Sequence, residues 1–148
     1  MRIMGRFLMS HIREVELFKK RSKIMLKEAR AQLSKGHYDL AVFLAEQAVQ
    51  LYLKAVILNK TGTMSRTHTI RDLMGALRII YPKKAKEIDN FVKQNRSLFI
   101  RLEEAYISSR YLFREYREDE AEELVKFAEE VMKFVRNIEV SNTTSETS

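Results

Sequence analysis

Apolar residues recur three and four positions apart along most of this chain, the spacing that places side chains on one face of an α-helix. The pattern predicts helices over residues 12–34, 39–59, 69–80, 82–106 and 119–138. We find no repeats and no segment that alternates apolar and polar residues for the length of a strand. The sequence therefore predicts an all-α fold, a bundle of four to five helices.

Residues with special backbone preferences mark several of the predicted helix ends. Gly36 follows the first helix at the position of a left-handed C-cap. Pro82 suits the first turn of a helix, and Asp119 with Glu122 has the spacing of a capping box. These residues fix where the predicted elements separate.

The predicted helix over residues 39–59 differs from the others because it is apolar nearly all round. Such a helix lies at the centre of a bundle or in a subunit interface. Its main stripe is rich in alanine, which permits close packing of neighbouring helices. We expect one apolar side to face the core and the other to face a second copy of the chain.

The length of 148 residues suits one domain. We expect an N-terminal extension over residues 1–11, a single helical domain over 12–140 and a disordered tail over 141–148. The chain has no cysteine, which excludes disulfides, thiolate metal sites and a cysteine nucleophile. No uninterrupted apolar run approaches the roughly 18 residues of a membrane span, and we read no signal peptide, so we expect a cytoplasmic protein.

Positive charge is concentrated in the first half of the chain. The formal net charge is +7, and residues 1–80 hold 15 Lys and Arg against 6 Asp and Glu. A basic half favours an anionic partner such as a nucleic acid or a nucleotide, although lysines also simply keep helices soluble.

Three polar residues, Gln47, Gln50 and Lys54, follow one another at helical spacing in the central helix. They form either a solvated edge or a polar groove that holds phosphate groups and base edges. Spacing alone favours the solvated edge. His68, just before a helix start, can contact an anion or exchange a proton, but a histidine there is more often a capping residue.

The segment over residues 110–117 alternates arginines with aromatic rings. Guanidinium groups bind phosphates with paired donors, and aromatic faces stack on bases. The alternative is that the rings are core residues and the arginines pair with the nearby acidic residues. Both interpretations fit this segment, whose candidate binding residues are Arg110, Tyr111 and Arg114. No phosphate-binding glycine loop or metal-ligand cluster is present.

Three short motifs in order resemble the HEPN family over residues 15–138. Residues 36–55 are similar to its Gly-x-Tyr turn and alanine-rich helix, with Gln47-Ala48 followed by Lys54-Ala55. Residues 67–70 resemble its Thr-His-x-Leu/Ile element, and residues 109–111 its Ser-Arg-Tyr segment. The resemblance implies an up-and-down helical bundle that forms a homodimer and accompanies a minimal nucleotidyltransferase.

Some members of that family are metal-independent ribonucleases of toxin–antitoxin and defence systems, and these use an Arg-x(4–6)-His motif in the later helices. This chain has no histidine after His68, and the nearest counterpart is Arg110 with Tyr116. A tyrosine does not readily replace an imidazole near pH 7. The ribonuclease interpretation is therefore weakened.

The leading hypothesis is a non-catalytic HEPN module that binds a nucleotide or RNA without a cofactor or metal. Lys54 and Arg110 would hold phosphate, Tyr111 would stack on a base and Gln47 would contact its edge, with His68 and Arg114 beside them. One alternative is a divergent ribonuclease toxin that uses Arg110, Tyr116 and His68. A second alternative is a purely structural dimeric interaction module.

Overall fold

The computed structural model describes the backbone of residues 2–111 and 114–147 and the side chains of residues 11–107 and 114–142. Within these residues it contains helices and no strand. The α-helices are α1 (Arg2–Ser34), α2 (Tyr38–Thr61), α3 (Ile70–Ile80), α4 (Ala85–Gln94), α5 (Arg96–Tyr111) and α6 (Glu118–Thr147), and a 3₁₀ turn spans Pro82–Lys84. The predicted all-α bundle is confirmed.

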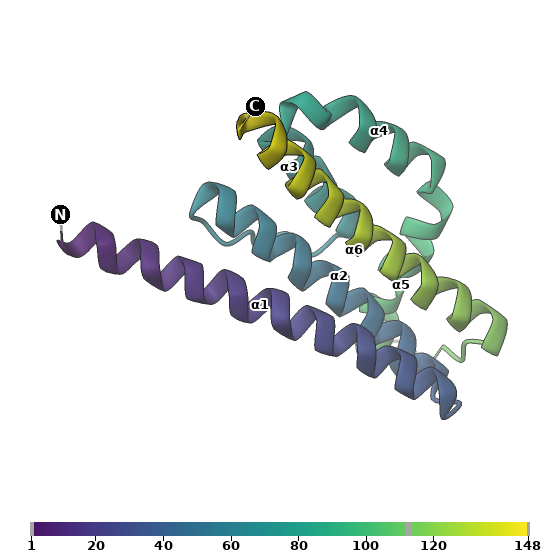
Figure 1. The fold of residues 1–148 in the computed structure, drawn as a ribbon. Coiled ribbons are helices and arrows are strands. Elements are labelled where there is room, and N and C mark those ends of the chain that lie inside the picture. The colour runs from purple at the N-terminus through teal and green to yellow at the C-terminus, as the bar shows by residue number, and fades with distance from the viewer. Residues whose placement is uncertain (1, 112–113, 148) are drawn as a thin grey trace.

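Helix α2 is the centre of the bundle. α1 runs antiparallel to it on one side and α6 lies along its other side (Figure 1), while α3 and α5 also contact it. Its fully buried residues include Ala41, Ala45, Ala48 and Ala55, whose small side chains let the neighbouring helices approach closely. The second apolar side of α2 is therefore covered within one chain.

By length and composition alone, α2 is apolar enough to cross a membrane. From the sequence we expected no such segment, because a few polar residues interrupt its apolar run. In the structure most of that segment is buried inside the bundle. Packing against the neighbouring helices accounts for its apolar character.

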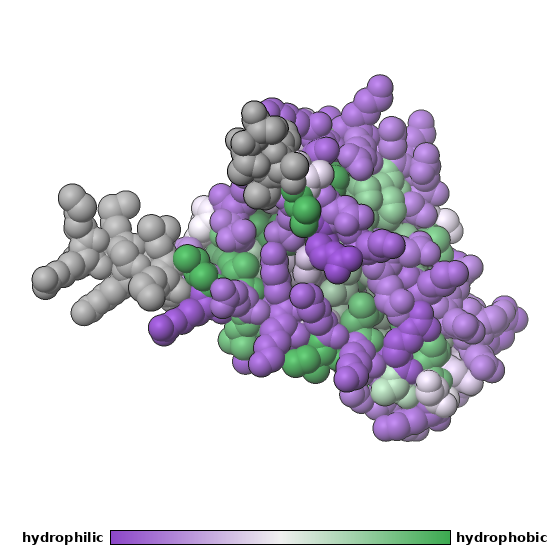
Figure 2. All heavy atoms as spheres, in the orientation of Figure 1, coloured by the Kyte–Doolittle hydropathy of each residue, from purple (hydrophilic) through white to green (hydrophobic). Residues whose placement is uncertain are grey.

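The burial of α2 also removes the surface that we assigned to a dimer partner. Leu40 is the large apolar residue of α2 that is clearly exposed. On the face in Figure 2, apolar side chains show in separate areas between polar ones. The homodimer stays a prediction, but its interface must be formed elsewhere than on the central helix.

The turn between α1 and α2 depends on Gly36, as its position in the sequence predicted. Its φ is 80°, in the left-handed region, and its N–H donates to the carbonyl of Leu33 at 3.1 Å. The N–H of His37 reaches back to the carbonyl of Gln32 at 2.9 Å. These bonds satisfy the last carbonyls of α1 and reverse the chain into α2.

The single helix predicted over residues 82–106 is instead a 3₁₀ turn followed by α4 and α5. The break falls at Asn95, whose side-chain amide donates to the carbonyl of Phe91 at 2.9 Å. The backbone N–H of Asn95 donates to the same carbonyl at 3.1 Å, so Asn95 closes the last turn of α4 with both its backbone and its side chain. An asparagine within an apolar pattern gave no sign of this break.

The outer helices are longer than the sequence indicated. α1 begins at Arg2, within the segment assigned to an extension, and α6 continues to Thr147, through residues assigned to a disordered tail. Asn142 is buried, and the hydroxyl of Ser141 donates to the carbonyl of Ile138 at 3.4 Å. The first residues after 140 are therefore packed against the domain.

Gly75 is a helical glycine with open space around it, because a Cβ built there meets no heavy atom within 4 Å. Replacing Gly75 with alanine is expected to raise the free energy of unfolding by about 0.5–1 kcal/mol, since glycine loses more backbone entropy in a helix. Urea unfolding of the two proteins measures the difference. A less stable alanine variant would mean that this site does not tolerate a methyl group.

Candidate functional site

The polar residues of α2 are organised around a buried carboxylate that the sequence analysis did not select. Glu46 is fully buried, and its two oxygens accept from the side-chain amides of Gln50 and of Gln47, the latter at 2.8 Å. Gln50 is itself buried. Gln47 and Gln50 are therefore not a freely solvated edge, because both hold an ionisable group inside the bundle.

Burial raises the pKa of Glu46 to about 7, because desolvation disfavours the charged carboxylate. The amides of Gln50 and Gln47 oppose this shift, and the nearby carboxylate of Glu103 adds to it. The ammonium of Lys54 acts in the opposite direction to Glu103. The carboxylate of Glu46 therefore interacts electrostatically with Glu103 on α5 and with Lys54 on α2.

Lys54 meets His68 at the surface, as the candidate site required. The Lys54 Nζ lies 3.3 Å from His68 Nδ1, and the His68 ring stacks on Tyr106 of α5 with ring centroids 5.6 Å apart. Partial burial lowers the pKa of Lys54, and the charge of Glu46 counteracts that effect. Three elements, α2, the loop before α3 and α5, therefore meet at one small polar surface.

The contact with Lys54 favours one tautomer of the neutral His68 ring. An ammonium can only donate a hydrogen bond, so Nδ1 accepts and the neutral ring holds its proton on Nε2. In this tautomer the Nε2–H is a donor. His68 is thus suited to bind an anion, and less suited to accept a proton through Nε2.

Glu103 anchors the adjacent end of α3. It accepts from the backbone N–H of Arg71 at 2.9 Å and from Arg71 Nε at 2.9 Å. These bonds satisfy one of the unpaired N–H groups of the first turn of α3 and bind that helix to α5. The loop that carries His68 is consequently anchored where it enters α3.

Two of the predicted binding residues, Arg110 and Tyr111, have side chains outside the described residues. Their backbone forms the last turn of α5, and Arg110 follows Tyr106 by four positions. That spacing places residues 106 and 110 on the same side of a helix. Their roles stay predictions.

Arg114 and Tyr116 belong to a different environment. The Arg114 guanidinium pairs with Glu104 at 2.8 Å and Glu120 at 3.3 Å, and lies over the Tyr116 ring, 4.5 Å from its centroid. Tyr116 is buried, and its backbone N–H donates to Asp39 at 3.0 Å. Within the described contacts neither residue joins Lys54 or His68. Their arrangement corresponds to the alternative in which the rings are core residues and the arginines pair with nearby acidic residues.

The surface around Lys54 and His68 offers donors for an anion and a flat aromatic edge at Tyr106. Among the described side chains there is no group of three or more His, Cys, Asp or Glu residues able to hold a metal ion. The chemistry available here is therefore that of ammonium, imidazole and amide groups.

Comparisons with known proteins give a family match, a sequence relative and a structural neighbour. The model of the HEPN domain family matches residues 15–138. A protein of Methanocaldococcus jannaschii named "Putative toxin MJ1304" is 28% identical over 143 residues, which cover 86% of this chain and 89% of that protein. The crystal structure of TT1696 from Thermus thermophilus has the same fold, with a TM-score of 0.66 and 24% identity, covering 84% of this chain and 98% of that one.

Proposed function

This chain belongs to the HEPN domain family, and from that premise we propose that it is a module that binds a nucleotide or RNA where Lys54 and His68 meet. The contact between these residues, with Tyr106 stacked on the imidazole, carries the proposal. Lys54 donates to a phosphate oxygen, and the Nε2–H of His68 donates to another. The amide oxygen of Gln47 and the ring of Tyr111 are assigned to the base.

Electrostatics and preorganisation support this assignment. Ordering a lysine and a histidine on an anion costs conformational entropy, and here the protein has already placed both groups. Tyr106 holds the imidazole plane, and the buried carboxylate of Glu46 lies on the same helix as Lys54.

Replacing Lys54 with glutamine is expected to weaken the binding of a labelled ten-nucleotide RNA by about 10-fold at low salt, the loss of one charge-assisted hydrogen bond. The slope of the logarithm of the association constant against the logarithm of the salt concentration should decrease in magnitude by about one, because one phosphate contact is lost. Fluorescence anisotropy at several salt concentrations measures both. The matched control is Lys126→Gln, which removes the same charge from an exposed position on α6. Equal losses in the two variants would contradict the site.

A divergent ribonuclease is the second candidate, because His68 lies at this surface with its ring stacked on Tyr106. In that case the residues involved are Arg110 and His68, since Tyr116 is buried. Incubation with RNA in the presence of a chelator tests it: cleavage that disappears in His68→Ala supports catalysis. An absence of cleavage by the unmodified protein removes this candidate and leaves the binding module.

We propose further that the protein partner is a minimal nucleotidyltransferase in a toxin–antitoxin-like or defence pair. The family membership supports this, as does the toxin in the name of the archaeal relative. Co-expression with a nucleotidyltransferase encoded beside this chain, followed by size-exclusion chromatography, tests it. Co-elution supports the pair, and separate elution of the two proteins contradicts it.

A further inference from the structure

A groove of about 350 Å³ lies between α3 and α4. Its apolar lining residues are Met74, Ile88 and Val92, of which Met74 and Ile88 are almost fully buried, and Gly75 lines it without a side chain. Since a Cβ at Gly75 would meet nothing within 4 Å, that position is open space. The volume is in the range of sites for small organic molecules.

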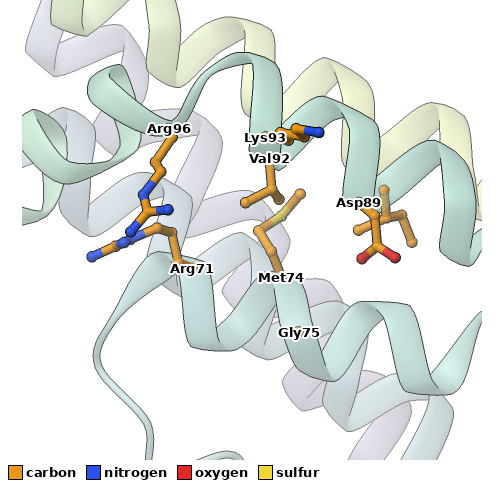
Figure 3. Close-up of a pocket in the computed structure, with 8 residues that line it drawn as sticks. Arg71, Met74, Gly75, Asp89, Val92, Lys93 and Arg96 are labelled. Atoms are coloured by element: carbon orange, nitrogen blue, oxygen red, sulfur yellow. The ribbon is translucent and has the colours of Figure 1, made fainter.

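The charges around this groove are distributed unequally. Arg71 from α3 and Arg96 from the first turn of α5 point toward one another at one end, while Asp89 lies at the other end (Figure 3). Lys93 lines the groove from α4. Asp89 pairs with Arg78 at 2.8 Å, so its end of the groove is electrically neutral.

The end of the groove at Arg71 and Arg96 carries excess positive charge. Arg71 is already compensated by Glu103, through Nε at 2.9 Å. No ion pair is found for Arg96 within the described part of the chain, so its positive charge stays uncompensated there, whereas Lys93 points away from the two arginines (Figure 3).

We propose that this groove binds a phosphomonoester that carries a flat apolar group. A phosphomonoester has a charge close to −2 at neutral pH, and planar guanidinium groups bind phosphate oxygens in pairs. The phosphate lies between Arg71 and Arg96, and the flat group lies against Val92 and the open space at Gly75, next to the buried Met74. The site is separate from the surface of Lys54 and His68 and does not depend on the function proposed for it.

Two sources present this chemistry, a free nucleoside monophosphate and the 5′-phosphorylated end of an RNA. The test follows the methyl resonance of Met74 in protein labelled at its methionine methyl groups, during titration with either probe. The first probe is adenosine 5′-monophosphate, and adenosine is its control. The second probe is a 5′-phosphorylated RNA octamer, and its 5′-hydroxyl twin is the control.

We expect a saturable shift of Met74 with a phosphorylated probe and at least a 10-fold weaker response without the phosphate. Saturation by the mononucleotide identifies a free ligand, and saturation by the RNA alone identifies an RNA end. Failure of both phosphorylated probes at millimolar concentration overturns the proposal. Equal binding of the phosphorylated and unphosphorylated forms overturns it as well.

Two variants test the groove without disturbing the fold. Gly75→Leu fills the open space at no change of charge, and Arg96→Gln removes one uncompensated cation. Each should weaken binding at least 10-fold, whereas Lys54→Gln should leave it unchanged. Undiminished binding in Gly75→Leu, with thermal unfolding confirming a folded protein, would place the ligand elsewhere. Because Lys54→Gln affects only the other site, the two proposals fail separately.

Discussion

Replacing Phe127 with alanine is expected to lower the free energy of unfolding by roughly 3–5 kcal/mol, the usual cost of removing a buried aromatic ring. Phe127 is fully buried on α6, with its ring edge-on to Phe99 at a centroid distance of 4.9 Å. Phe91 stacks on the same ring at 6.5 Å. The alanine variant therefore leaves a cavity where α4, α5 and α6 meet.

Urea unfolding followed by circular dichroism measures this loss. Phe134→Ala is the matched control, because Phe134 stacks on Phe91 at 4.0 Å but is only partly buried. We expect a smaller loss there, since water reaches part of the site. If Phe127→Ala costs no more than Phe134→Ala, the packing of α6 against α4 and α5 is not as described.

Replacing Glu46 with glutamine is expected to stabilise the protein above pH 7 by about 3 kcal/mol, the equivalent of the shift in the Glu46 pKa from 4.5 to about 7. Between these values the unfolded chain has lost its proton while the native protein keeps it. The native state then binds more protons than the unfolded state, so stability falls as the pH rises. Above pH 7 both states are ionised and the loss is complete.

The difference between the Glu46→Gln variant and the natural protein should therefore be small below pH 4.5, grow between pH 4.5 and 7 and stay constant above. Urea unfolding at a series of pH values across this range measures the profile. Glu130→Gln, on an exposed position of α6, is the control and should show no such growth. A difference that does not change with pH would show that Glu46 is ionised in the native protein throughout this range.

The helical pattern of the sequence was sufficient to predict the fold because each helix buries a continuous apolar stripe. The central place of α2 followed from its apolar residues on all sides, and the turn at Gly36 followed from a conformation that glycine adopts without strain. The break at Asn95 could not be predicted, because a single asparagine within an apolar pattern does not mark a helix end. The periodicity also could not show that neighbouring helices of the same chain bury the second apolar side of α2, which we had expected to face a second copy.

The candidate site was predictable only in part. Lys54 and His68 were selected separately in the sequence. Their contact, between α2 and the loop before α3, could be seen only in the tertiary structure. Glu46 was missed because a single acidic residue in an apolar helix resembles a surface position, and its burial depends on Gln47 and Gln50. The groove beside Arg96 combines residues from three helices, which no sequence motif records.

The most direct test of the account is to map RNA binding by NMR on the labelled protein. An RNA decamer without a 5′-phosphate is titrated while the resonances of Lys54, His68 and Tyr106 are followed. The account predicts that these three shift together with one affinity, and that Lys54→Gln weakens the response at His68. Saturable shifts confined to the segment over residues 114–117, with His68 and Tyr106 unchanged, would contradict it.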